Sequence, residues 1–138
     1  MNKASARNAA RTASPCPCGK PLTYAGCCGV YHGGLPAPDA EALMRSRYSA
    51  YVQRDEAYLR ATWDPATAPG EPLFEADGGP KWIGLTVLRH QITAPDEAVV
   101  EFVARCRVGG RAQRLHEISR FVRRDGRWYY VAGDHPAD

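Results

Sequence analysis

The sequence predicts an α+β fold in which a small metal-binding knuckle comes first, two helices second and an antiparallel sheet last. Apolar residues recur with helical spacing in 40–54, and they alternate along 97–108 as in a half-buried strand. Gly109-Gly110 and Asp125-Gly126 are two-residue turns of the kind that join hairpin strands. Strands joined by such short turns are antiparallel neighbours, so we expect a meander whose apolar face only the helices are able to cover.

The two helices lie between proline-rich stretches. Asp39 stands at the N-cap position of the helix predicted over 40–54. A shorter helix over 56–63 ends at Asp64-Pro65, because the residue before a proline disfavours helical backbone. Residues 64–80 hold four prolines and three glycines and are predicted to form a loop. Strands are predicted over 82–92, 97–108, 112–123 and 127–132.

The basic excess of the chain lies in its first residues. The 138 residues carry a net charge of +3, and residues 1–14 contain Lys3, Arg7 and Arg11 but no acid, which predicts a disordered basic tail. The rest is formally neutral, which argues against a strongly basic nucleic-acid-binding domain. We find neither an apolar run of ~20 residues nor the apolar stretch of a signal peptide, so we expect a cytoplasmic protein that does not enter a membrane.

Four of the five cysteines gather in one short segment. Cys16, Cys18, Cys27 and Cys28 fall within 13 positions, among glycines that permit tight turns. In a reducing compartment such a cluster is more typical of a metal site than of disulfides. Four thiolates complete the tetrahedral coordination of zinc and leave no open position, which predicts structural Zn²⁺, although an all-thiolate site also suits iron. His32 is the alternative to Cys28 as fourth ligand.

This segment resembles the SEC-C motif, C-x-C-x8-C-[HC], found at the C-terminus of the bacterial preprotein translocase motor ATPase. Cys16, Cys18, Cys27 and Cys28 match its ligand positions. Two features depart from the motif: Gly19-Lys20-Pro21 replaces the usual Gly-Ser-Gly, and Cys28 stands where the translocase has histidine. In the translocase the motif engages an export chaperone, so the resemblance implies an interaction surface on the knuckle.

From about residue 15 to the end, the chain resembles the YchJ family of small bacterial proteins. The resemblance implies a SEC-C-like zinc knuckle over 15–35 and a nuclear-transport-factor-2-like domain over 36–138, in which a curved sheet wraps around helices as a cone. Proteins of this fold include enzymes, ligand-binding modules and interaction domains, so the fold alone assigns no function. The residues that carry the resemblance are Cys16-Pro17-Cys18-Gly19, Cys27-Cys28-Gly29, Ala42-Leu43-Met44-Arg45-Ser46-Arg47-Tyr48-Ser49-Ala50, His116-Glu117-Ile118-Ser119-Arg120-Phe121 and Gly126-Arg127-Trp128-Tyr129-Tyr130-Val131.

The strand predicted over 112–123 carries polar residues on both faces, so the sequence does not reveal which face points into the cone. If the face with Glu117 and Ser119 is inside, the buried carboxylate needs a partner, and Arg45 or Arg47 is the candidate. The contact is then either a structural ion pair between helix and sheet or part of a ligand pocket.

In the pocket hypothesis, Glu117 or His116 is a general acid or base, Arg45 clamps an anion, and aromatic side chains form the walls. His116 and Glu117 are adjacent in a strand and point to opposite faces, so they cannot form a direct dyad. The candidate pocket residues are Arg45, Tyr48, Trp63, His116, Glu117, Ser119 and Tyr130.

Two functional hypotheses follow. In the first, the chain is a metal-stabilised binding or adaptor protein rather than an enzyme, and it engages a protein or ribosomal/RNA partner through the knuckle and basic residues. In the second, a polar cavity in the cone serves a small-ligand-binding or enzymatic domain. Arginines crowd the two predicted hairpins, either as a solvated surface or as a site for an acidic partner. They are Arg105, Arg107, Arg111, Arg114, Arg120, Arg123, Arg124 and Arg127.

Overall fold

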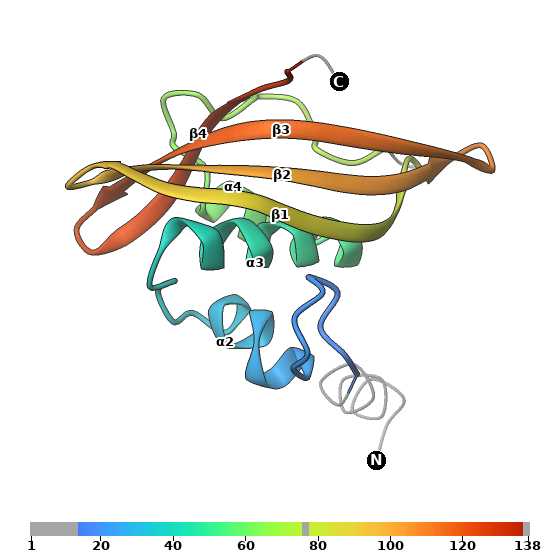
Figure 1. The fold of residues 1–138 in the computed structure, drawn as a ribbon, viewed down its shortest axis with the longest axis horizontal. Helices are drawn as coiled ribbons and strands as arrows, with labels where there is room; N and C mark the ends of the chain where they lie inside the picture. The colour runs from blue at the N-terminus through green and yellow to red at the C-terminus, as the bar shows by residue number, and fades with distance from the viewer. Residues whose placement is uncertain (1–13, 76–77, 137–138) are drawn as a thin grey trace.

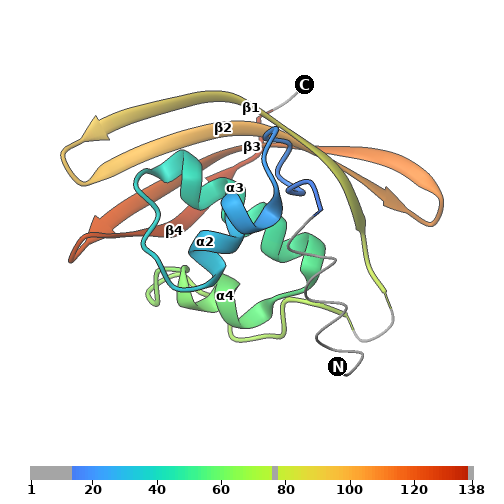
Figure 2. The same ribbon diagram turned by 90° about the horizontal axis from the view of Figure 1, so that it is seen from below.

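The computed structural model describes residues 14–75 and 78–136, so the tail predicted over 1–14 lies outside the described residues except for Ser14. A four-stranded antiparallel sheet curves over the helices, which lie on its concave side (Figures 1 and 2). Helices come first and strands second along the chain, which confirms the predicted α+β class. None of the helices formed by the described residues has the length and hydropathy needed to cross a bilayer.

The two longer helices each begin at an aspartate whose side chain caps the helix. In the longest helix, Asp39 Oδ1 accepts the N–H of Ala42 at 2.7 Å, as predicted for an N-cap. Arg54, with a left-handed φ of 57°, closes the other end. Two further helical segments in the knuckle are too short to show a periodicity in the sequence. In chain order the segments are η1 (Tyr24–Gly26, a 3-10 helix), α2 (Cys28–His32), α3 (Ala40–Gln53) and α4 (Glu56–Ala61).

The strands form a meander in the order β1-β2-β3-β4, and each neighbouring pair is antiparallel. The β2–β3 and β3–β4 turns hold residues with positive φ at 109–110 and 125–126, which is typical of two-residue hairpin turns. The strands lie within a few residues of the predicted ranges. They are β1 (Lys81–Ala94), β2 (Glu97–Val108), β3 (Arg111–Arg124) and β4 (Arg127–Asp134).

The pairing of β3 with β4 contains one bulge. Phe121 pairs with Tyr130, whereas its neighbour Arg120 pairs with Ala132. Val131 is therefore an extra residue in β4, and it shifts the register of everything that follows it.

α4 ends two residues earlier than predicted, because the chain leaves the helix to pair with β4. Tyr130 donates its N–H to the carbonyl of Thr62 at 2.8 Å, and Asp64 donates its N–H to the carbonyl of Tyr130 at 2.8 Å. Trp63 thus forms an isolated bridge with Tyr130, which an α-helical backbone could not make.

α3 lies between the knuckle and the sheet (Figure 1). A single cluster of buried residues contains the four cysteines of the knuckle, Met44 and Tyr48 of α3, and Val100 and Phe121 of the sheet. The knuckle and the sheet therefore share one core through α3.

Candidate functional site

The local structure of the knuckle brings two pairs of cysteines together. A tight turn follows Cys16, whose N–H donates to the carbonyl of Leu22 at 2.9 Å. Cys27 and Cys28 stand at the start of α2, where the chain passes close to η1. A Cβ on Gly29 would lie only 2.6 Å from the carbonyl oxygen of Tyr24, so this approach requires glycine.

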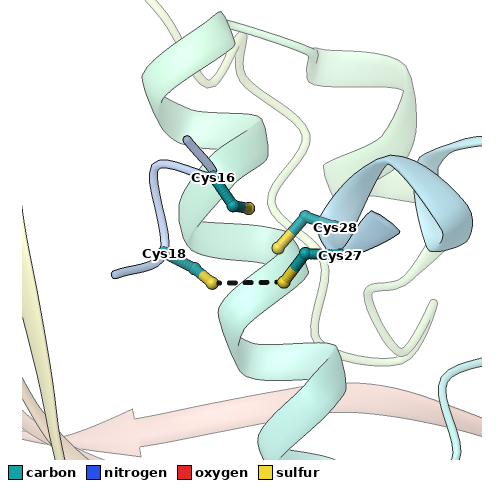
Figure 3. A group of neighbouring side chains, drawn as sticks. All are labelled: Cys16, Cys18, Cys27 and Cys28. Carbon is teal, nitrogen blue, oxygen red and sulfur yellow. Dashed lines mark hydrogen bonds between the residues drawn. The ribbon is translucent and has the colours of Figure 1, made fainter. Parts of the chain in front are cut away.

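The four sulfurs point toward one centre (Figure 3). Cys16, Cys18, Cys27 and Cys28 are all buried, and their sulfurs lie within 4.8 Å of one another. A tetrahedral site with metal–sulfur bonds of ~2.3 Å has sulfur–sulfur edges of about 3.8 Å, and a disulfide bond measures about 2.05 Å. The distance from Cys18 Sγ to Cys27 Sγ is 3.6 Å, close to the first value and far from the second. The cluster could therefore hold a metal ion.

Hydrogen bonding distributes charge unevenly among these sulfurs. Hydrogen bonds from Cys18 and Cys28 hold the pKa of Cys16 far below its usual range. Burial raises the pKa of Cys27 to about 12, and the hydrogen bond to Cys16 raises the pKa of Cys28 well above its usual range. Without a metal, the cluster thus favours a thiolate at Cys16 and opposes ionisation of Cys27 and Cys28. A divalent cation bound among the four sulfurs would favour their ionisation, because its positive charge stabilises the thiolates.

His32 is engaged away from the sulfurs. Its Nε2 lies 2.8 Å from the carbonyl oxygen of Ser46, and because a carbonyl only accepts, Nε2 carries the proton. Its Nδ1 therefore accepts from the hydroxyl of Tyr24 at 2.5 Å. Both ring nitrogens are used, whereas Cys28 lies in the sulfur cluster. The geometry thus favours Cys28 over His32 as the fourth ligand.

Polar contacts tie the knuckle to α3. Cys16 Sγ lies 3.7 Å from Ser49 Oγ, and His32 contacts the Ser46 carbonyl. Arg45 donates from NH1 to the carbonyl of Cys18 at 2.9 Å. Stabilising the knuckle should therefore also stabilise the position of α3.

A cavity of about 200 Å³ lies on the other side of α3, against the concave face of the sheet. Met44, Ser119 and Phe121 of its wall are buried, whereas Trp82 and Leu115 are half-buried. Its polar lining residues are Arg47, Glu117 and Ser119, besides the hydroxyls of tyrosines. Its aromatic lining residues are Tyr48, Tyr51, Trp82, Phe102, Phe121 and Tyr130.

Glu117 is a buried carboxylate in the wall of this cavity, with 8% of its surface exposed. Its Oε2 accepts hydrogen bonds from Ser119 Oγ and from the hydroxyl of Tyr130, the latter at 3.1 Å. Its Oε1 lies 3.2 Å from Nε2 of His135, just after β4. The carboxylate occupies the space that a side chain on Gly133 would need. Glu117 has no arginine partner within the described residues.

Arg47 is also buried in the cavity wall, but its hydrogen bonds go to residues at the end of α4 and not to Glu117. It donates from NH1 to the carbonyl of Leu59 at 2.8 Å and to Thr62 Oγ1 at 2.7 Å. Its guanidinium carbon lies 4.9 Å from the ring centroid of Trp63 and 4.6 Å from that of Tyr130. Burial lowers the pKa of Arg47. Arg47 thus joins α3 to α4 rather than to the carboxylate.

The tyrosines of the cavity remain hydrogen-bond donors at neutral pH. Burial raises the pKa of Tyr48 to about 12. Burial and the nearby charge of Glu117 raise the pKa of Tyr130 further above its usual range. Both hydroxyls therefore keep their protons, and that of Tyr130 continues to donate to Glu117.

Residues 39–133 match the family model described as the middle NTF2-like domain of YchJ, which spans more than half of the chain. The chain belongs to the YchJ family. This confirms the resemblance found in the sequence.

Curated relatives of this YchJ-family chain are similar over most of their length. A UPF0225 protein of Xanthomonas oryzae pv. oryzae is 58% identical over 118 residues, which cover 85% of this chain and 92% of the relative. A UPF0225 protein of Bordetella pertussis is 55% identical over 122 residues, covering 86% of this chain and 91% of the relative.

Two solved structures share the fold of this YchJ-family chain, and both are described as SEC-C motif containing proteins. The solution structure of the Rhodopseudomonas palustris protein aligns with a TM-score of 0.76 at 37% identity, over 88% of this chain and 98% of that one. The crystal structure of the Psychrobacter arcticus protein aligns with a TM-score of 0.71 at 28% identity, over 94% of this chain and 86% of that one. The knuckle and the sheet thus occur together in relatives.

Some of the predicted pocket residues lie at the cavity and others do not. Of the seven, the lining set contains Tyr48, Glu117, Ser119 and Tyr130, so the mixed strand β3 turns its Glu117 face inward. Trp63 is not in the lining set; its ring packs edge-on against that of Tyr130, with the ring centroids 5.1 Å apart. The role of these residues in ligand binding stays a prediction.

Two of the predicted placements are wrong. Arg45 points toward the knuckle, where it donates to the Cys18 carbonyl and pairs with Glu41 at 2.9 Å, so it is no anion clamp in the cavity. His116 points to the convex face of the sheet and contacts Glu101 at 2.7 Å. The alternation of side chains along β3 places His116 outside once Glu117 is inside.

Sequence reasoning placed Arg45 rather than Arg47 among the pocket residues of this YchJ-family chain, and it did not consider His135. Met44, Tyr48 and Tyr51 recur at helical spacing along α3, and position 47 shares their face, whereas position 45 does not. Arg47 was therefore the better of the two arginine candidates. His135 was hidden by the β4 bulge, which no sequence feature indicated.

Proposed function

We propose that this YchJ-family protein is a zinc-stabilised binding protein, rather than an enzyme, that holds a small molecule in the cavity between α3 and the sheet. The observation that carries the proposal is the buried carboxylate of Glu117 in a largely aromatic cavity wall, where two hydroxyls and the imidazole of His135 contact it but no described arginine does. Burying a carboxylate costs stability that an apolar side chain at the same position would not cost. Mostly apolar cavities with a few convergent polar groups are typical ligand sites.

Zinc is the metal that best fits the proposed structural role of the knuckle. Four cysteine sulfurs with near-tetrahedral spacing would satisfy all its coordination positions, so the ion would bind no substrate. The reduced thiols that such a site needs are typical of the cytoplasm. Because α3 bonds the knuckle on one side and lines the cavity on the other, zinc would stabilise the cavity wall.

The binding function is tested by titrating ¹⁵N-labelled protein with a library of small uncharged and charged fragments. We expect at least one fragment to shift the amide signals of cavity-lining residues. Ala104→Leu fills the cavity from β2 and should abolish those shifts, whereas Ala112→Leu, an exposed alanine on β3, should not. If no fragment shifts any lining residue, the proposed function is wrong.

The metal is tested on the same purified protein. Elemental analysis should find about one zinc per chain, consistent with four sulfurs for one ion. A visible charge-transfer absorption accompanied by iron would overturn the zinc assignment, because zinc thiolate sites are colourless.

Binding of an acidic partner such as RNA is a second candidate function. Exposed Arg107 and Arg111 flank the β2–β3 turn and have no acidic partner within the described residues. In contrast, Arg120, Arg123 and Arg124 each pair with an aspartate at 2.9 Å. RNA binding measured by fluorescence anisotropy should weaken in the double variant Arg107→Ala/Arg111→Ala and not in Arg120→Ala. The absence of salt-dependent binding by the unmodified protein would remove this candidate.

A further inference from the structure

We infer that the cavity takes a small, uncharged aromatic or heteroaromatic ring that donates one N–H or O–H hydrogen bond to Glu117. This rests on the proposed function, namely that the cavity binds a small molecule, and it names the chemistry of that molecule. Three observations support it: an acceptor position left on the carboxylate, the balance of charge in the wall, and the aromatic shape of the cavity.

The carboxylate of Glu117 has room for one more donor. Its two oxygens together offer about four acceptor positions. Ser119 and Tyr130 fill both positions of Oε2, and His135 occupies one position of Oε1 at 3.2 Å. No other described side chain donates to Oε1. A ligand N–H or O–H that reaches the carboxylate from the cavity would be held by a charge-assisted hydrogen bond.

The charges that line the cavity already cancel. Arg47 and Glu117 are the charged residues of the lining set, and they carry opposite signs. His135 lies nearby but keeps 58% of its side chain exposed to solvent. An ionised ligand would therefore add an uncompensated charge to a largely aromatic enclosure, which costs much more than placing an uncharged polar group there. The cavity thus favours a neutral ligand.

The size and wall of the cavity favour a flat ring. A cavity of about 150 Å³ in another protein accommodates benzene, so about 200 Å³ suits one ring or two fused rings. Half of the lining residues are aromatic. In the cavity wall, the ring centroid of Trp82 lies 6.3 Å from the centroids of both Tyr48 and Tyr51, in edge-on and tilted contacts. Rings arranged in this way offer both faces and edges to a further aromatic ring.

The test compares indole with benzofuran, which has the same fused-ring shape but carries an oxygen in place of the N–H group. Dissociation constants are measured by NMR titration of the intact, metal-loaded protein. We expect indole to bind at least about tenfold more tightly, because a hydrogen bond to a charged acceptor accounts for that ratio. Benzamidinium and benzoate, which are cationic and anionic single rings, should bind more weakly than indole.

Two variants assign the difference to the carboxylate. Glu117→Gln should remove most of the preference for indole over benzofuran, whereas Glu101→Gln, on the convex face of the neighbouring strand, should preserve it. Equal affinities for indole and benzofuran in the unmodified protein would overturn the donor inference while leaving the proposed function intact. Tighter binding of either charged ring would overturn the inference of a neutral ligand. Failure of all four compounds and of every library fragment to bind would overturn the proposed function itself.

Discussion

His135 Nε2 lies 3.2 Å from Glu117 Oε1, and the single extra residue in β4 makes this contact possible. Without the bulge, the pairing of Phe121 with Tyr130 would continue down the strands and place Asp134 opposite Glu117. The bulge instead pairs Asp134 with Ile118 and carries His135 on to Glu117. A histidine donor thus replaces a second carboxylate, which would have repelled the first.

Gly133→Ala should destabilise the protein by about 1–3 kcal/mol, because the new methyl group would overlap the carboxylate of Glu117 and force it off its donors. Gly84→Ala on β1 is the matched control, since a Cβ there meets no atom within 4 Å. Urea unfolding monitored by tryptophan fluorescence measures both changes. Equal free energies of unfolding for the two variants would show that the carboxylate is not fixed in place.

Cys28→Ser should remove the metal and lower the midpoint of thermal unfolding by about 10 °C or more, because a structural metal contributes directly to folding. Cys106→Ser is the control, since Cys106 is also buried but lies outside the sulfur cluster. Because knuckle and sheet share a core through α3, a single transition should shift as a whole. Full metal content in Cys28→Ser would exclude Cys28 as a ligand.

Arg47→Ala should cost about 3 kcal/mol of stability. The substitution leaves the Leu59 carbonyl without its donor in a buried place and removes a cation from two aromatic faces. Arg89→Ala, which removes a half-exposed contact with Glu101 at 3.4 Å, should cost less than about 1 kcal/mol. Chemical denaturation measures the difference, and a cost for Arg47→Ala as small as for Arg89→Ala would contradict the buried role.

Local signals in the sequence were sufficient for most of the fold. Asp39 caps α3 as predicted, and the Gly109-Gly110 turn joins β2 to β3. The cysteine spacing likewise predicted the cluster. These features depend on residues close together in the chain, so short-range rules describe them.

The remaining features depend on contacts between distant segments. The end of α4 is set by Tyr130 of β4, whose backbone pairs with Thr62 and Asp64. The position of His135 is set by the bulge in the pairing of β4 with β3, and no pattern in the sequence of β4 predicts that bulge. The distinction between Arg45 and Arg47 was available from helical spacing, but only once the sheet had been placed against the face that carries Tyr48.

The stability of the protein should fall as the pH rises through the range from 10 to 12. Burial raises the pKa of Tyr48 from 10.0 to about 12, so the folded state holds its proton more tightly than the unfolded state does. The resulting stabilisation is complete below pH 10 and is lost as the pH approaches 12; for Tyr48 alone it amounts to about 2–3 kcal/mol. Tyr48→Phe should therefore lower stability by a constant amount below pH 10, because it loses the hydrogen bond of the Tyr48 hydroxyl with the backbone of Gly84, and it should show a shallower decline above pH 10. Free energies of unfolding at pH 7, 10 and 11.5 test this, and a decline that is as steep in Tyr48→Phe as in the unmodified protein would show that Tyr48 does not contribute to it.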